Sequence, residues 1–256
     1  MAEKFSAFLR RTAFSAEWTC ALCGREIFGG GHFCKTCAAE LPYNGGGICL
    51  HCGRQVKESA PVCPACENRL PDLDAGRSPF VYRGGVADLI RKFKYGGARW
   101  LAEVFAPYLA ETWEKSGFRA DVALWVPMTA KEQKKRGFNQ SELLAGEFSL
   151  LTGIPALGLL EKKRETARQA ELGGEARRKN TEGAFRTAEK GGAAGKTLLV
   201  LDDVTTTGAT LQAAANALKR GGAKRVYALT IASVPWESFP REGSGETEKE
   251  RESADS

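Results

Sequence analysis

The chain lacks any uninterrupted apolar run of about 20 residues, the length that a helix needs to cross a bilayer. Its first residues also lack the apolar core of a secretory signal, because Arg10 and Arg11 interrupt that stretch. The two absences predict a cytoplasmic protein with no membrane insertion. Residues 1–17 are expected to form a short helical segment docked on the body of the protein.

Residues 236–256 lack helical or strand periodicity and contain few apolar side chains, which predicts a disordered tail. The remaining chain is long enough to bury a substantial core, since 43% of the 256 residues are hydrophobic. The composition divides it into a small cysteine-rich module at 18–75 and a main domain at 76–235.

The eight cysteines form four C-x-x-C pairs, and the second two pairs repeat the first two at a constant offset of 29 residues. Each repeat reads C-x2-C-x10-C-x2-C; we call residues 20–37 the first repeat and residues 49–66 the second repeat. Two residues between cysteines allow a tight turn to point both sulfurs at one metal. In a reducing compartment this pattern predicts closed, structural zinc sites instead of disulfides. The predicted ligands are Cys20, Cys23, Cys34, Cys37, Cys49, Cys52, Cys63 and Cys66.

The equal spacing favours one zinc ion per repeat, although a cross-braced pairing and an iron–sulfur or redox role stay open. His32 and His51 lie inside the module, but the cysteines already fill both sites, so both are expected to be surface or packing residues. Basic and acidic residues are interleaved between 18 and 70 without a basic stripe. This favours a structural or partner-docking module over direct nucleic-acid binding.

The formal charge of +6 suggests an anionic partner. However, four thiolates around one Zn²⁺ carry a net charge of about −2, so two such sites would lower the total to about +2. The overall charge therefore says little about nucleic-acid binding.

The main domain contains a strand–loop–helix–strand unit near its end. Residues 198–201 form a short apolar run typical of a strand buried on both faces, and 211–218 predict an Ala-rich helix that ends at Gly221. Residues 226–234 predict the next strand. This order indicates an α/β fold with a parallel sheet, whose ligands bind at the carboxyl ends of the strands.

The loop between the first of these strands and the helix has the composition of a ribose-phosphate site. Asp202 and Asp203, the acidic pair, are expected where the strand ends. Two carboxylates suit ribose hydroxyls and an attendant Mg²⁺, whereas simple helix capping would not explain the threonines that follow. Small hydroxyl residues at a helix N-terminus present N–H and O–H donors to a phosphate. The predicted phosphate loop comprises Thr205, Thr206, Thr207, Gly208, Ala209 and Thr210.

The segment GGAAGKT at 191–197 looks like a nucleotide-binding P-loop but does not fit one. It is one residue shorter than G-x4-G-K-[ST], and it precedes a strand where a P-loop would follow one. We interpret it as a linker turn into the strand.

LDDVTTTGAT at 201–210 resembles the phosphoribosyl pyrophosphate signature of type I phosphoribosyltransferases, with Thr205 in place of the usual aliphatic residue. Three further stretches resemble the ComF/GntX family: RKFKYGGARWLAEVFA at 91–106, VPMTAKEQKKRGFNQSELLA at 126–145, and the stretch 166–185. The resemblance covers roughly residues 18–235, and RGFNQ at 136–140 is its most specific part. It implies a type I phosphoribosyltransferase-like domain after a double zinc ribbon, and an association with DNA uptake in competent bacteria.

By this resemblance the acidic pair would be catalytic and would contact the ribose hydroxyls. Cations beyond the expected strand at 121–126 would meet the pyrophosphate charge, although a solvated helix face would also explain them. Arg164, Arg168, Arg177 and Arg178 would belong to a mobile flap. The pyrophosphate loop would be formed by Pro127, Met128, Thr129, Lys131 and Arg136, with Lys134 and Lys135 beside it.

The sequence and the resemblance predict two alternative functions. The first is a phosphoribosyltransferase, or a sensor descended from one, that binds Mg-phosphoribosyl pyrophosphate; the resemblance to type I phosphoribosyltransferases, which often pair, implies a homodimer. The second is a non-catalytic DNA-uptake accessory that binds single-stranded DNA or a helicase partner. Single-strand sites combine cations with stacking aromatics. The candidates are Phe93, Tyr95, Trp100 and Phe138, near Lys92, Lys94, Arg99 and Arg136.

Overall fold

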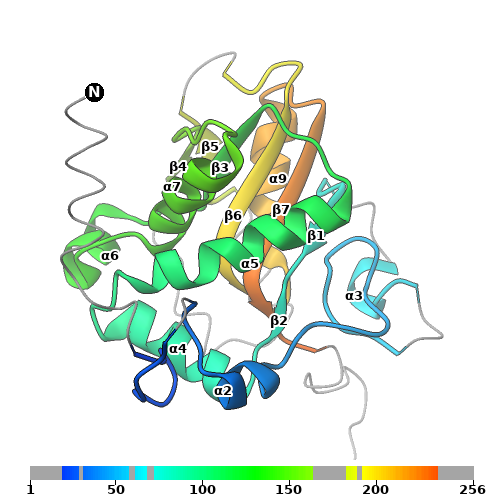
Figure 1. Cartoon of the computed structure of the whole chain (residues 1–256). Coiled ribbons are helices and arrows are strands. Elements are labelled where there is room, and N and C mark those ends of the chain that lie inside the picture. The colour runs from blue at the N-terminus through cyan, green and yellow to red at the C-terminus, as the bar shows by residue number, and fades with distance from the viewer. Residues whose placement is uncertain are drawn as a thin grey trace, which may run out of the picture.

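A computed structural model describes residues 19–28, 31–57, 61–67, 72–163, 183–188 and 192–235 of the chain (Figure 1). The expected N-terminal helix at 1–17 and the expected tail at 236–256 lie outside these residues. Within the described ranges, no helix combines the length and the apolar character that a membrane span requires.

A parallel sheet forms the centre of the main domain. Its strand order is β1-β7-β6-β3, with β2 pairing beside β1 on the same edge of β7. All of these pairings are parallel, as the sequence predicts for an α/β fold. The strands are β1 (Ala75–Arg77), β2 (Phe80–Val81), β3 (Val122–Trp125), β6 (Thr197–Thr205) and β7 (Arg225–Ser233).

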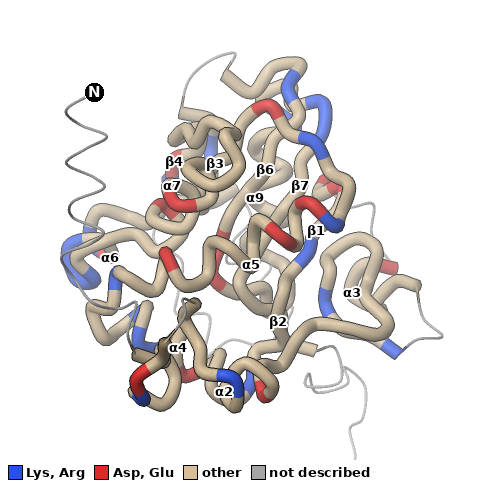
Figure 2. Tube along the Cα trace, in the orientation of Figure 1, with Lys and Arg blue, Asp and Glu red and all other residues tan. Residues whose placement is uncertain are grey.

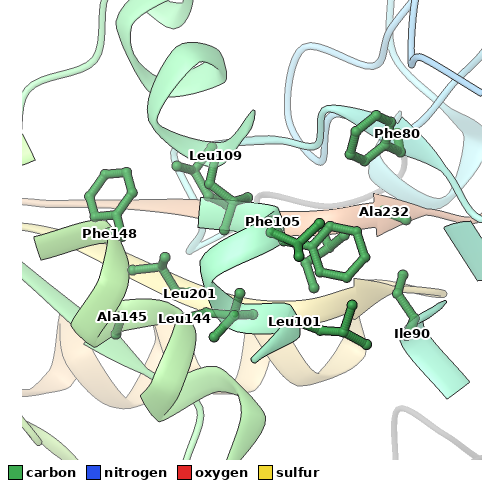
Figure 3. Packing of buried hydrophobic residues seen from close by; sticks show 14 of the residues in the cluster. Phe80, Ile90, Leu101, Phe105, Leu109, Leu144, Ala145, Phe148, Leu201 and Ala232 are labelled. Atoms are coloured by element: carbon green, nitrogen blue, oxygen red, sulfur yellow. The ribbon is translucent and has the colours of Figure 1, made fainter. Parts of the chain in front are cut away.

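Helices cover both faces of the sheet (Figure 1). Along β6, Leu199 and Leu201 face a core built with the helices of one face, whereas Leu198 and Val200 face the helix on the other. This alternation explains why the strand is an unbroken apolar run. Figure 3 shows the first of these cores, in which Phe105 packs near Leu144 and Leu201. The first face carries α4 (Gly84–Tyr95), α5 (Leu101–Ser116) and α7 (Gln140–Thr152), and the second carries α9 (Ala209–Arg220).

Strand β6 is longer than the sequence indicated. It continues beyond Leu201 through both residues of the acidic pair to Thr205, which pairs with Ser233 of β7. The continuation has a physical reason: Val204 and Thr205 are β-branched and suit a paired strand. The expectation that the strand ends at the acidic pair was therefore wrong by a few residues.

The cysteine repeats lie against the main domain at two places (Figure 1). Helix α2 (Lys35–Ala39) begins within the first repeat and helix α3 (Pro64–Glu67) begins within the second. A separate antiparallel pair is formed by β4 (Leu160–Lys162) and β5 (Phe185–Thr187). The four arginines of the expected flap fall at 164–182, outside the described residues.

Candidate functional site

Each cysteine repeat gathers its own four sulfur atoms. Cys20, Cys23, Cys34 and Cys37 form one cluster and Cys49, Cys52, Cys63 and Cys66 the other, with the ligand atoms of each cluster all within 4.8 Å of one another. The structure thus groups the cysteines by repeat, not in the cross-braced pairing, and neither His32 nor His51 joins them.

The sulfur spacing suits tetrahedral zinc. A Zn–S bond of about 2.3 Å places the sulfurs of a tetrahedron roughly 3.8 Å apart. The Sγ atoms of Cys23 and Cys34 are 3.8 Å apart, and those of Cys52 and Cys63 are 3.7 Å apart. In the second repeat the backbone N–H of Cys63 also donates to Cys49 Sγ at 3.3 Å. Both repeats therefore fit closed four-cysteine zinc sites with a structural role.

The acidic pair lies at the carboxyl end of β6 and is held by two side chains. Lys94 Nζ, from the end of α4, lies 2.8 Å from Asp203 Oδ1. Ser141 Oγ, from the first turn of α7, donates to Asp202 Oδ1 at 2.8 Å. Sequence reasoning assigned Lys94 to a basic surface and gave Ser141 no role, because no motif pairs them with residues so distant in the chain. The fold brings all four side chains together.

The electrostatics of this cluster follow from its burial. Burial, and to a smaller extent the charge of Asp203, raises the pKa of Asp202 to about 7. Burial alone would lower the pKa of Lys94, but the charges of Asp203 and Asp202 outweigh it and raise that pKa. The cluster thus holds one firm ion pair and a second carboxyl that titrates near neutral pH.

The predicted phosphate loop divides into two parts. Thr205 is buried, and its hydroxyl lies 3.1 Å from that of Thr230, which lies 2.7 Å from that of Ser78. Its side chain therefore belongs to the sheet, contrary to the expectation that it faces a phosphate. Gly208 has φ 80° and precedes the first residue of α9, a left-handed conformation that glycine adopts readily. Thr206, Thr207, Gly208, Ala209 and Thr210 are all half-buried around this helix start.

The predicted pyrophosphate loop follows β3, the neighbour of β6. Because these strands are parallel, Pro127 and Met128 lie at the same edge of the sheet as the phosphate loop. Thr129 caps helix α6 (Ala130–Arg136) in a reciprocal capping box with Glu132. Figure 2 shows that Lys and Arg concentrate on α6, which carries Lys131 and Arg136.

The RGFNQ stretch at 136–140 supports the site through buried side-chain hydrogen bonds. Asn139 Nδ2 donates to the Val126 carbonyl at 3.1 Å, and Gln140 Nε2 donates to the Phe93 carbonyl at 3.2 Å. Both side chains are buried, so they tie the start of α7 to the ends of β3 and α4. These hydrogen bonds fix the start of α7 and thereby place Ser141 beside Asp202.

Comparisons with known proteins agree with this architecture. A family described as "Double zinc ribbon domain" matches residues 13–72, and one described as "Phosphoribosyl transferase domain" matches residues 149–250. Competence protein ComFC of Streptococcus pneumoniae is 32% identical over 155 residues, which cover 60% of this chain and 66% of the relative. ComFC of Bacillus subtilis is 30% identical over 161 residues, 62% and 64% respectively. The chain thus spans about two thirds of the length of these relatives.

Two further comparisons cover less of the chain or have lower identity. DNA utilization protein YhgH of Escherichia coli O157:H7 is 35% identical over 107 residues, which cover 41% of this chain and 46% of the relative. Purine phosphoribosyltransferase from Pyrococcus horikoshii has a TM-score of 0.32 and 20% identity, covering 55% of this chain and 91% of that structure.

The parallel sheet and the two cysteine clusters define a phosphoribosyltransferase-like domain preceded by a double zinc ribbon. The fold class predicted from the sequence is confirmed. The ComFC and YhgH relatives place the chain within this class, and it belongs to the ComF family.

Proposed function

We propose that the protein binds Mg-phosphoribosyl pyrophosphate at the carboxyl end of β6 and acts as a phosphoribosyltransferase or a sensor descended from one. One observation carries the proposal: an acidic pair of one half-buried and one buried carboxylate near the carboxyl end of β6 is followed by a loop that opens a helix with a positive-φ glycine. The first feature suits ribose hydroxyls, and the second suits a phosphate. The division at 18–75 and 76–235, the cytoplasmic location and the homodimer stay predictions.

The roles of the chain's own groups follow from their places. Asp202 and Asp203 accept hydrogen bonds from the ribose hydroxyls. The N–H groups at 206–210 hold the 5′-phosphate. Cations of α6 lie on the side from which pyrophosphate leaves and oppose its charge. Mg²⁺, whose oxygen-ligand preference fits two carboxylates and a diphosphate, would supply further charge neutralisation when bound. Before the ligand arrives, Lys94 neutralises Asp203.

Calorimetry with Mg-phosphoribosyl pyrophosphate tests this site. We expect the wild-type protein to bind and Asp203→Ala to lose at least about tenfold in affinity, equivalent to ~1.4 kcal/mol, because a carboxylate that accepts ribose hydroxyls is gone. Asp88→Ala removes an exposed carboxylate on α4 and should leave the affinity unchanged. Absence of binding to wild type, or equal affinity in Asp203→Ala, would refute the proposed site.

A second candidate function, single-strand DNA binding during DNA uptake, is favoured by one surface. Tyr95 is the last residue of α4, Trp100 directly precedes α5, and the two are 76% and 40% exposed. Arg136 lies over the Tyr95 ring at 5.2 Å, so a cation accompanies one of these two exposed rings. Phe93 and Phe138, by contrast, are buried core residues and do not belong to this surface.

The double variant Tyr95→Ala/Trp100→Ala should bind a single-stranded oligonucleotide at least about tenfold more weakly than wild type in a salt titration, since a stacked base contributes ~1–3 kcal/mol. Phe28→Ala is the control, because Phe28 is an exposed aromatic of the first repeat at 81%. If only Phe28→Ala weakens binding, the DNA contact lies in the zinc module; if neither variant does, this surface does not stack bases.

A further inference from the structure

Two arginines occupy equivalent places in the cysteine repeats but have different surroundings. CALCGR at 20–25 and CLHCGR at 49–54 both place an arginine two residues after the second cysteine. Arg25 is exposed, whereas Arg54 is 1% exposed and is the largest fully buried side chain among the described residues. Burial of a guanidinium is costly unless it forms hydrogen bonds. A hydrogen-bond partner of Arg54 therefore indicates one role of this burial.

Arg54 reaches from the second repeat to the phosphate loop. Its Nη2 donates a hydrogen bond to the backbone carbonyl of Thr206. The same nitrogen lies 3.9 Å from the position that a Cβ on Gly208 would take. Arg54 thus lies directly against the backbone of residues 206–208, although it is 152 residues away from Thr206 in the sequence.

The base of Arg54 is fixed to the sheet. A Cβ at Gly53 would lie 2.3 Å from the carbonyl oxygen of Gly76 in β1, so only glycine allows this approach. Asn44 Nδ2 links the second repeat to the segment after β1, because it donates to the Gly53 carbonyl at 2.8 Å and to the Ser78 carbonyl at 3.1 Å. The turn that carries two zinc ligands is therefore packed and hydrogen-bonded at the strand edge, and Arg54 projects from this anchored turn.

The hydrogen bond determines the direction of one peptide group. In a planar trans peptide the carbonyl of residue i and the N–H of residue i+1 point in opposite directions. Because Arg54 holds the Thr206 carbonyl, the N–H of Thr207 points away from Arg54, toward the opposite side of the loop. A cation at the carbonyl also polarises the peptide and strengthens its N–H as a donor. A phosphate bound by this loop would meet that donor.

We propose that Arg54 of the second zinc ribbon is a positioning residue that orients the Thr206–Thr207 peptide for binding a phosphate, so that the second zinc site is part of the phosphate-binding machinery. The identity of the anion rests on the proposed function, but the orientation of the peptide does not. The first repeat lacks this connection, since Arg25 is exposed.

The test compares Arg54→Gln with Arg25→Gln, the same substitution at the equivalent position of the other repeat, and includes Arg54→Lys. Zinc content is measured first. Amide hydrogen exchange then follows residues 205–213 in the ligand-free protein, because the N–H of Gln212 donates to the Gly208 carbonyl and reports on the loop. Calorimetry gives the affinity for Mg-phosphoribosyl pyrophosphate.

We expect Arg54→Gln to keep both zinc ions, to exchange several-fold faster at 205–213 alone, and to bind about tenfold more weakly. Arg25→Gln should match wild type, and Arg54→Lys should restore part of the affinity, since a lysine retains one charged donor. A purely structural role would instead change exchange throughout the second repeat or release zinc, and either result would overturn the proposal.

The exchange measurement separates this proposal from the proposed function. If wild type binds the ligand and Arg54→Gln has unchanged affinity and exchange, the positioning role is wrong and the ligand site stands. If wild type does not bind the ligand, the proposed function fails, and faster exchange confined to 205–213 in Arg54→Gln still supports the positioning role. If Arg54→Gln does not fold, Arg54→Lys decides: unchanged exchange and affinity in that folded variant would contradict a requirement for the guanidinium.

Discussion

Replacing Cys63 by serine is expected to remove the zinc of the second repeat and to lower the free energy of unfolding by about 4 kcal/mol, as loss of a structural metal can do. Cys49, Cys52 and Cys63 are buried, and Val56 and Val62 pack around them. A serine at position 63 leaves an incomplete ligand set, and the three remaining thiolates lose the cation that compensates their charge. Metal analysis and urea unfolding measure the two effects.

Cys34→Ser is the matched variant in the first repeat, at the equivalent ligand position. It should also remove one zinc ion but destabilise the protein less, because Cys23 is exposed and Cys34 and Cys37 are only half-buried. The first repeat still contacts the main domain through Leu22, which lies against Gly85 of α4. Equal destabilisation by the two substitutions would contradict the difference in burial. Retention of two zinc ions by either variant would contradict the ligand assignment.

Features that depend on a local sequence pattern could be predicted from the sequence. The C-x-x-C pairs and their constant offset predicted two four-cysteine clusters, because each turn brings its own sulfurs together. The apolar run at 198–201 predicted a strand buried on both faces, and the helix that follows it was expected to end at Gly221, where α9 does end. GGAAGKT was interpreted as a turn before a strand, and Thr197 does begin β6.

Contacts between segments distant in the chain could not be predicted from pattern. Thr205 is a small hydroxyl residue of the kind that often binds a phosphate. However, its position in β6, paired with β7, directs its hydroxyl to Thr230. Lys94 looked like one cation of a basic surface, but in the fold its ammonium group lies beside Asp203 of β6. Arg54 and Arg25 are indistinguishable in sequence, and only docking of the second repeat on β1 distinguishes them.

Asp202 is proposed to bind the ligand, but its ionisation in a buried place lowers the stability of the fold. The variant Asp202→Asn should show these two effects separately. Burial raises the pKa of Asp202 to about 7, well above the ordinary range of a carboxyl. The folded state therefore holds a proton that the unfolded state releases, and ionisation destabilises the fold as the pH rises from about 4 to 7. Asparagine is neutral throughout and can still accept the hydrogen bond from Ser141.

We expect Asp202→Asn to be more stable than wild type by about 2 kcal/mol at pH 8, roughly half of what the full rise in the pKa would give, because solvent still reaches the carboxyl. The advantage should shrink at pH 6 and remain constant above pH 8, because Asp202 is then fully ionised. Urea unfolding at pH 6, 7 and 8 measures it, with Asp88→Asn as a control for an exposed carboxylate.

The same variant should lose affinity for Mg-phosphoribosyl pyrophosphate, since an amide supplies one acceptor where the carboxylate supplies two. Greater stability together with weaker binding would show that Asp202 lowers the stability of the fold but contributes to ligand binding. Identical pH dependence in wild type and Asp202→Asn would show that the folded protein does not resist this ionisation. Higher stability with undiminished affinity would instead place the ribose contact on Asp203 alone.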